Sequence, residues 1–188
     1  YYSFDPALES YFGAMPEGYW HDLGEGLPES VDIFWTGNRV CSEAISLADT
    51  AAIARQLGRQ VVLWDNYPVN DGEERSKHLF LDPLRDRDPG LRSQVRGHFC
   101  NPMNQGLLSL PALLGLAELY GDPAASRRWI IDRLGEPTWR RLQADREAFV
   151  TLGLEGMGPD RCEELAQCYA VLPGAADAST VKDIPATC

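Results

Sequence analysis

Three short apolar runs, each followed by polar residues, set the pattern of the first part of the chain. The clearest run is Val61–Trp64, and Asp65 and Asn66 follow it directly. A run at 31–36 (VDIFWT) precedes it, and a shorter one at 97–100 (GHFC) comes later. Short apolar runs between turn signals are typical of parallel strands that are buried on both faces. The pattern therefore predicts three strands whose carboxyl ends carry polar side chains.

The segment between the first two runs has the pattern of a helix. From Ser42 and Glu43 to Leu57, apolar residues such as Ile45 lie largely on one side, and Gly58 follows as a C-terminal stop signal. Strand, helix and strand thus follow one another with short connections, and the crossover is right-handed if the strands are parallel. These residues predict a βαβ unit.

Helical patterns account for most of the remaining chain. An N-terminal helical region is expected over 5–23, with Asp5 as its N-cap and Pro6 at the first helical position. No strand pattern reappears beyond Gly121. Further helical segments are expected at 91–95, 107–120, 124–134, 137–152 and 159–171.

We place a domain boundary near Gly121 because the composition changes there. Residues 1–121 form the α/β part, and residues 122–188 form a helical extension whose small, polar tail from Pro173 is expected to fray. Successive strands with helices between them fit either a doubly wound sheet or part of a (β/α)8 barrel. The chain begins without Met, which favours a piece of a longer protein and hence the C-terminal part of a TIM barrel.

Composition narrows the possible partners. The 188 residues, 44% of them hydrophobic, are enough for a core. The net charge of −11 argues against nucleic acid as a partner, since an acidic surface repels phosphates. We see neither a membrane-spanning run nor a signal peptide, which weakly favours the cytoplasm. The five cysteines form no CxxC pair, which favours isolated thiols in a reducing compartment over disulfides or zinc.

Polar and aromatic residues at the strand ends are the candidate site. An indole can pack against the C–H face of a sugar, and an Asn amide can recognise amides or hydroxyls. Trp64 as a core residue, and Asn66 and Asn101 as turn formers before proline, remain open alternatives. Asp65 should point to the opposite side and is expected to bond to the backbone or to an Arg. The run 85–88 (RDRD) is expected to be a solvated charge cluster.

Four motifs in order resemble glycoside hydrolase family 84, the protein O-GlcNAcases and bacterial β-N-acetylglucosaminidases. They are DIFWTG at 32–37, WDNYPVND at 64–71, LFLDPLRDRDP at 79–89 and CNPMNQ at 100–105. The resemblance covers about residues 1–121 and corresponds to the later strands of the family's barrel. It implies retaining hydrolysis of terminal N-acetylglucosamine, in which the substrate's own acetamide is the nucleophile and no metal or organic cofactor takes part.

The same resemblance assigns sugar-binding roles to five residues. Trp64 would be a wall of the pocket, Asn66 a donor near the acetamide, and Asp71 and Asn101 partners of the sugar hydroxyls; Tyr2 would line the acetamide pocket. Asp71 as a solvated loop carboxylate is the alternative. The family's adjacent pair of catalytic aspartates is absent, because the sequence contains no Asp-Asp. The resemblance therefore implies no catalytic residue in this chain.

The expected partner is a glycoprotein or glycan that carries N-acetylglucosamine. Two other functions stay open: a non-catalytic carbohydrate-binding module, and a hyaluronan-degrading glycosidase. Upstream sequence with an Asp-Asp pair at a strand end would favour the enzyme. Activity on a β-N-acetylglucosaminide or on hyaluronan would separate the two glycosidases.

Overall fold

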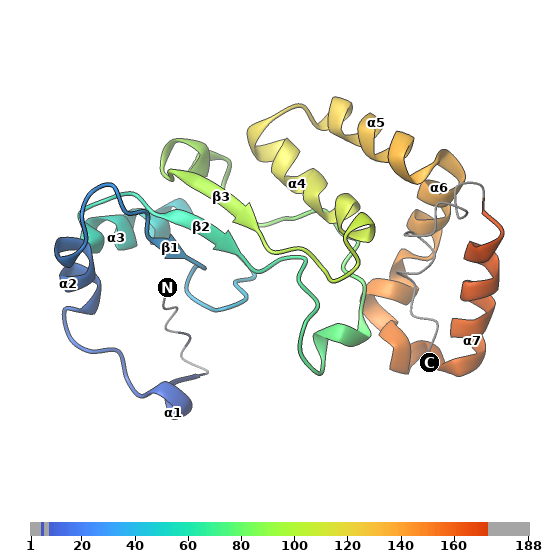
Figure 1. The fold of residues 1–188 in the computed structure, drawn as a ribbon, viewed down its shortest axis with the longest axis horizontal. Coiled ribbons are helices and arrows are strands. Elements are labelled where there is room, and N and C mark those ends of the chain that lie inside the picture. Colours follow the sequence, from blue (N-terminus) through green and yellow to red (C-terminus); the bar gives the residue numbers. More distant parts are fainter. Residues whose placement is uncertain (1–4, 6–7, 173–188) are drawn as a thin grey trace. The chain divides into compact units, whose positions relative to one another are not determined.

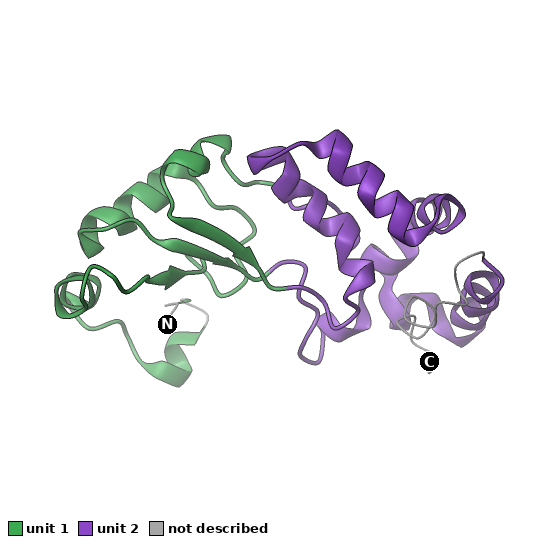
Figure 2. Ribbon diagram, turned by 45° about the horizontal axis from the view of Figure 1, so that its top comes forward, with its two compact units in different colours: residues 1–66, 85–101 green, residues 67–84, 102–188 purple. Residues whose placement is uncertain are grey.

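A computed structural model describes residue 5 and residues 8–172 of the chain. The chain divides into two compact units (Figures 1 and 2). Unit 1 comprises residues 1–66 and 85–101, and unit 2 comprises residues 67–84 and 102–188. No helix within the described residues is long and apolar enough to cross a membrane.

Unit 1 is an α/β unit built on a small parallel sheet. Its three strands are paired in sequence order, with Phe34 opposite Val62 and Leu63 opposite His98. The elements of this unit are α1 (Glu9–Phe12), α2 (Tyr19–Gly26), β1 (Phe34–Trp35), α3 (Leu47–Leu57), β2 (Val62–Asp65), the 3-10 helix η3 (Pro89–Ser93) and β3 (Gly97–Cys100).

One face of this sheet is buried under helices. Trp35 and Leu63 belong to the same buried cluster as residues of α2 and α3, among them Trp20 and Ile53. Helices α2 and α3 approach closely at Gly24, where an added Cβ would meet the Leu57 carbonyl oxygen at 2.1 Å. A side chain at Gly24 would therefore force the two helices apart.

Two expected elements of unit 1 are shorter than the sequence suggested, and both differences have a physical reason. The run 31–36 contributes only β1, because the N–H of Val31 donates to Pro28 in a turn. Helix α3 begins at Leu47 rather than near Ser42, with Ser46 as its N-cap. Ile45 instead pairs with the segment around Arg87. Gly58 ends α3 in the left-handed conformation, as predicted.

The N-terminal region and the second crossover also differ from expectation. The region 5–23 contains only the short α1 and then α2, which continues to Gly26. The Asp5 carboxylate accepts a hydrogen bond from the N–H of Val40 rather than acting as the N-cap of α1, a position that Leu8 occupies. Between β2 and β3 the described chain contains 3-10 turns and no α-helix.

Unit 2 is helical. Its elements are η2 (Arg75–Lys77), η4 (Leu107–Ser109), α4 (Leu110–Tyr120), α5 (Pro123–Leu134), α6 (Glu136–Ala144), the π-helix η5 (Ala148–Leu152) and α7 (Gly153–Ala170). Asp122 caps α5 and accepts hydrogen bonds from two backbone N–H groups, with Pro123 at the first position. The core of this unit includes Leu108, Leu142 and Leu165, which are almost completely buried.

The helical segments expected after Gly121 are present with adjusted ends. The segment 137–152 is divided into α6 and η5, and α7 begins earlier than expected, with a break at Gly158 before Pro159. Gly121, near which the boundary was expected, lies between α4 and α5. The domain boundary itself, where the barrel would end, stays a prediction. Residues 173–188, for which fraying was expected, lie outside the described residues.

Candidate functional site

An aromatic hollow lies on the face of the sheet that α2 and α3 do not cover. The ring of Phe34 makes edge contacts with Trp64 and with Phe99, each at 5.6 Å between centroids. The side chains of Trp64 and Phe99 remain 38% and 60% exposed. Together with Cys100 and Asn101 they line an open hollow of about 400 Å³, counting its mouth.

The amide of Asn66 links the polar groups at this strand end. Its Oδ1 accepts hydrogen bonds from the Trp64 indole at 2.9 Å and from the Asn101 amide at 3.2 Å. Its Nδ2 donates to the Val40 carbonyl at 2.7 Å. The main chain adds a further link, since the N–H of Asn101 donates to the Asp65 carbonyl at 2.8 Å. The strand ends thus bring Trp64, Asn66 and Asn101 together, as predicted from their positions.

These contacts restrict what the two amides can offer to a ligand. Within the part of the chain that the structure describes, the second Nδ2 hydrogen of Asn66 and the Oδ1 of Asn101 make no hydrogen bond to the protein. One donor and one acceptor therefore lie beside an exposed indole. This combination suits a ligand with an apolar ring face and a polar edge. The long-range bonds of Asn66 are unlike those of a turn-forming Asn, which bonds its own neighbours.

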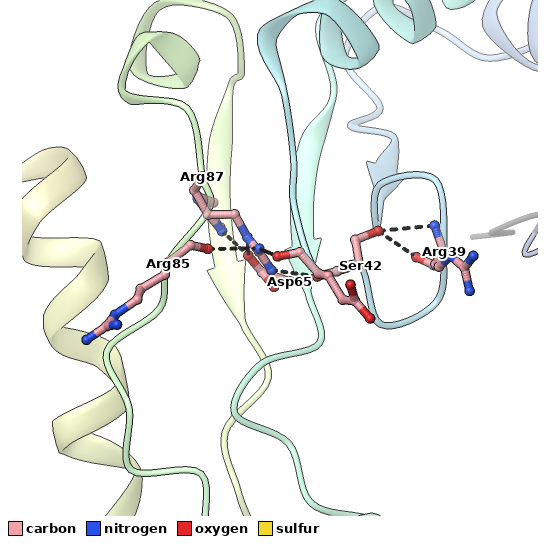
Figure 3. Close-up of polar contacts among 7 residues, drawn as sticks. Arg39, Ser42, Asp65, Arg85 and Arg87 are labelled. Atoms are coloured by element: carbon pink, nitrogen blue, oxygen red, sulfur yellow. Dashed lines mark hydrogen bonds and ion pairs between the residues drawn. The ribbon is translucent and has the colours of Figure 1, made fainter. Parts of the chain in front are cut away.

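Behind the strand end, Asp65 is buried in an ion pair. Its carboxylate is 1% exposed and accepts two hydrogen bonds from Arg87, each at 2.7 Å, and one contact from His98 at 3.0 Å. Figure 3 shows the Arg87 guanidinium against Asp65, with Ser42 and Arg85 beside it. Asp65 therefore has the structural role and the Arg partner that the sequence suggested. The solvated charge cluster expected at 85–88 is wrong for Arg87, which is buried.

The ion pair decides the protonation states around it. Burial alone would raise the pKa of Asp65, but the hydrogen bonds from Arg87 and His98 outweigh burial and lower that pKa. Burial, reinforced by the Asp65 charge, raises the pKa of the Cys100 thiol to about 12. The carboxylate is therefore ionised and the thiol protonated at neutral pH.

The same group has the composition of a metal site but fits a metal poorly. Ligand atoms of Asp65, His98 and Cys100 lie within 4.8 Å of one another. A metal requires a deprotonated thiol and free carboxylate oxygens. Here the thiol is held protonated, both Asp65 oxygens accept from Arg87, and the guanidinium adds a positive charge. These residues form a structural cluster.

The remaining predicted residues lie elsewhere. Tyr2 lies outside the described residues. Asp71 is exposed and belongs to unit 2, directly after the buried Asn70. The Asn70 amide donates to His78 O and to the Gln105 side chain, and accepts from the N–H of Asn104. Asn70 therefore anchors the loop from which Asp71 projects.

Sequence reasoning missed four residues around the site. Phe34 and Phe99 line the hollow. Alternate residues of a strand share a face, so their position beside Trp64 on one face of the sheet could have been inferred from the sequence. Arg87 and His98 hold Asp65. The only signal that could have found them is the rule that a buried carboxylate requires a cationic partner.

Comparison with known proteins identifies the family. A family model described as beta-N-acetylglucosaminidase matches residues 6–129, about two thirds of the chain. The chain belongs to the β-N-acetylglucosaminidase family, glycoside hydrolase family 84. This confirms the resemblance seen in the four motifs.

Individual relatives agree with this membership of family 84. Protein O-GlcNAcases of Rattus norvegicus and Mus musculus are each 30% identical over 102 residues, which is 54% of this chain and 11% of theirs. An O-GlcNAc hydrolase mutant from Thermobaculum terrenum is similar in structure, with a TM-score of 0.64 at 30% identity. That match covers 97% of this chain and 38% of the other. The chain thus spans only a minor part of the relatives' length.

Proposed function

We propose that this chain is the C-terminal part of a (β/α)8 catalytic domain in a retaining β-N-acetylglucosaminidase. The parent enzyme hydrolyses terminal O-linked N-acetylglucosamine on proteins or glycans, and this part supplies sugar-binding residues. The observation that carries the proposal is the grouping of Trp64, Asn66 and Asn101 at the carboxyl ends of β2 and β3. In barrels, active sites are built at this end of the strands.

The chemistry of N-acetylglucosamine matches the groups on this face. The exposed indole of Trp64 packs against the apolar face of the pyranose. The remaining N–H of Asn66 donates to the acetamide oxygen and keeps that group oriented towards the anomeric carbon. When the acetamide oxygen attacks the anomeric carbon, the glycosidic C–O bond breaks and the aglycone leaves with a proton from the parent enzyme's general acid. The sugar is left as an oxazoline, so no protein side chain is covalently bonded to it. Asn101 binds a hydroxyl at the edge of the ring.

The resemblance to family 84 also makes Asp71 a sugar-binding residue in this proposal. A carboxylate accepts two hydrogen bonds from neighbouring hydroxyls, and bonds to a charged acceptor contribute about 1.5–3 kcal/mol each. Its exposure and its anchored loop are compatible with this role. Because Asp71 would bind hydroxyls of the non-reducing sugar, its contribution to binding would not depend on the aglycone.

The acid–base groups must come from the rest of the parent protein. Substrate-assisted hydrolysis needs one carboxylate to polarise the acetamide and another to protonate the leaving group, and this sequence has no adjacent Asp pair. The exposure of Phe99 and Trp64 also supports a parent protein with further barrel strands, since those strands would cover part of this apolar sheet face.

Kinetics on the parent protein test this function. We expect the parent to hydrolyse an aryl β-N-acetylglucosaminide with retention and to leave hyaluronan intact. An Asn66→Ala variant should lose most of the first activity. Hyaluronan cleavage without N-acetylglucosaminide turnover would replace the proposal by the hyaluronan-degrading function. Sugar binding without any turnover would indicate a carbohydrate-binding module.

A further inference from the structure

Every hydrogen-bond donor of Arg87 is used within unit 1. Its Nε and one Nη2 hydrogen bind the two oxygens of Asp65. The remaining three donate to main-chain carbonyls: to Ser42 at 2.9 Å, to Glu43 at 2.6 Å and to Arg85 at 3.0 Å. A guanidinium has five donors in a fixed planar fork, so all of its recognition capacity is committed here.

Two of the carbonyls that Arg87 binds, those of Ser42 and Glu43, belong to the loop that holds Asn66. Within this loop the Ser42 hydroxyl accepts from the N–H of Arg39 and donates to its carbonyl, and Thr36 donates to the same carbonyl at 2.8 Å. The next residue, Val40, accepts the 2.7 Å hydrogen bond from the Asn66 amide. Figure 3 shows this succession from Arg87 through Ser42 to Arg39.

Arg87 therefore acts on Asn66 from two sides. Through Asp65 it fixes the end of β2, one residue before Asn66. Through the carbonyls of Ser42 and Glu43 it fixes the loop whose Val40 carbonyl orients the Asn66 amide. Buried ion pairs are poor evidence of stabilisation, since desolvation offsets much of the attraction. Stability alone therefore does not explain a buried charged pair that lies one residue from a proposed sugar contact.

We propose that Arg87 is a positioning residue for the sugar site, which holds the Asn66 amide in the orientation that an N-acetyl group requires. The inference rests on the proposed function. It assigns no contact between Arg87 and the sugar. It requires that the effect of Arg87 on catalysis passes through Asn66.

Arg87→Lys in the parent enzyme is the test. Lysine keeps the charge but loses the fork, so the Asp65 pair can persist while the loop carbonyls lose their donors. We expect kcat on an aryl β-N-acetylglucosaminide to fall by about tenfold with KM within about twofold, because a misplaced amide matters most when the acetamide becomes the nucleophile. In an Asn66→Ala background the same substitution should change kcat by less than about twofold.

Arg59→Lys is the matched control. Arg59 likewise donates to main-chain carbonyls of unit 1, those of Gly24, Leu27, Pro28 and Val31. Among the described residues, none of these partners lies in the loop from Thr36 to Glu43. This variant should lower the thermal midpoint and leave kcat and KM unchanged. Equal losses from Arg87→Lys with and without the Asn66 amide, or unchanged kcat, would overturn the inference.

Ser42→Ala decides the question if Arg87→Lys does not fold. This substitution removes only the hydroxyl that is hydrogen-bonded to the main chain of Arg39. It should lower kcat by about threefold, and this loss should be absent in the Asn66→Ala background. No change, or a loss that persists without the amide, would refute the positioning role. If the unmodified parent does not turn over N-acetylglucosaminides, the proposed function fails and the inference fails with it; turnover with an inert Arg87→Lys refutes the inference alone.

Discussion

Truncating Asn66 to alanine is the most informative single change, because the structure separates its expected effects on stability and on catalysis. The substitution removes three hydrogen bonds, those with Trp64, Asn101 and Val40. The indole is 38% exposed, so water can replace much of what is lost. We expect the free energy of unfolding of the parent to fall by about 1 kcal/mol, the contribution of roughly one net hydrogen bond.

The expected catalytic loss is larger. The proposed contact of the remaining Asn66 N–H with the acetamide would contribute about 0.5–1.5 kcal/mol, and a similar amount would be lost when Trp64 and Asn101 no longer share a fixed partner. The sum, about 1–3 kcal/mol, corresponds to about 5- to 140-fold in kcat/KM at 1.4 kcal/mol per tenfold. Steady-state rates on an aryl β-N-acetylglucosaminide measure it, and kcat should account for most of the loss.

A control at the opposite end of the same strand tests whether the effect is local. Gln60 precedes β2 and makes one long hydrogen bond, 3.3 Å to Ser93 O. Gln60→Ala should leave kcat/KM unchanged. If Asn66→Ala keeps kcat/KM within about twofold while stability falls, Asn66 is a strand-end residue with a structural role, and the assignment of the acetamide contact is refuted.

Three further predictions concern other parts of the chain. Asp71→Ala should lower kcat/KM of the parent by about 10- to 100-fold or more for every aglycone, with Asp71→Asn less affected and Glu73→Ala as the neighbouring control; a change within about twofold would make Asp71 a solvated loop carboxylate. The isolated 188-residue chain should not hydrolyse an aryl β-N-acetylglucosaminide, since it has no Asp-Asp pair, and turnover that follows the protein through size-exclusion chromatography would contradict this. Because the pKa of Asp65 is lowered in the folded state, its ionisation contributes stability that is present above the ordinary pKa of about 3.9 and is lost as the pH falls through the folded-state value. Acid titrations of unfolding should show this loss, and Asp65→Asn should abolish that part of the pH dependence.

The local signals in this sequence were reliable where short-range chemistry decides the structure. Gly58 ends α3 in the left-handed conformation, and Asp122 with Pro123 begins α5. The runs at 61–64 and 97–100 became paired parallel strands, β2 and β3. Each of these features depends on a few consecutive residues, so one sequence is enough to predict it.

The predictions that failed depend on tertiary contacts. Residues 42–46 have the periodicity of a helix, but the carbonyls of Ser42 and Glu43 accept from Arg87 and Ile45 pairs with the strand-like segment beside it. These contacts use carbonyls that a helix would have needed. Nothing in the local pattern reveals that a distant arginine will compete for them.

The residues of the candidate site also divide into those that local sequence predicts and those that depend on tertiary contacts. Trp64, Asn66 and Asn101 could be predicted because polar residues at the ends of parallel strands meet at one edge. Arg87 could not be predicted from its own surroundings, since a run of alternating Arg and Asp usually lies in water. The usable signal came from its partner: Asp65 was expected to point to the opposite side of the strand end and to bond to the backbone or to an Arg.

The failed helix start and the missed arginine have a common cause, and it bears on function. Extending α3 back to Ser42 would use its carbonyl and that of Glu43 within the helix, and Arg87 would be left with unpaired buried donors. The loop would then no longer present the Val40 carbonyl to Asn66. Local preference is thus overridden at the segment that orients a proposed sugar contact. Departures from local rules gather at functional sites, where a defined geometry matters more than helix length. The 42–46 segment therefore supports, independently of the aromatic hollow, the proposal that this strand end binds the sugar.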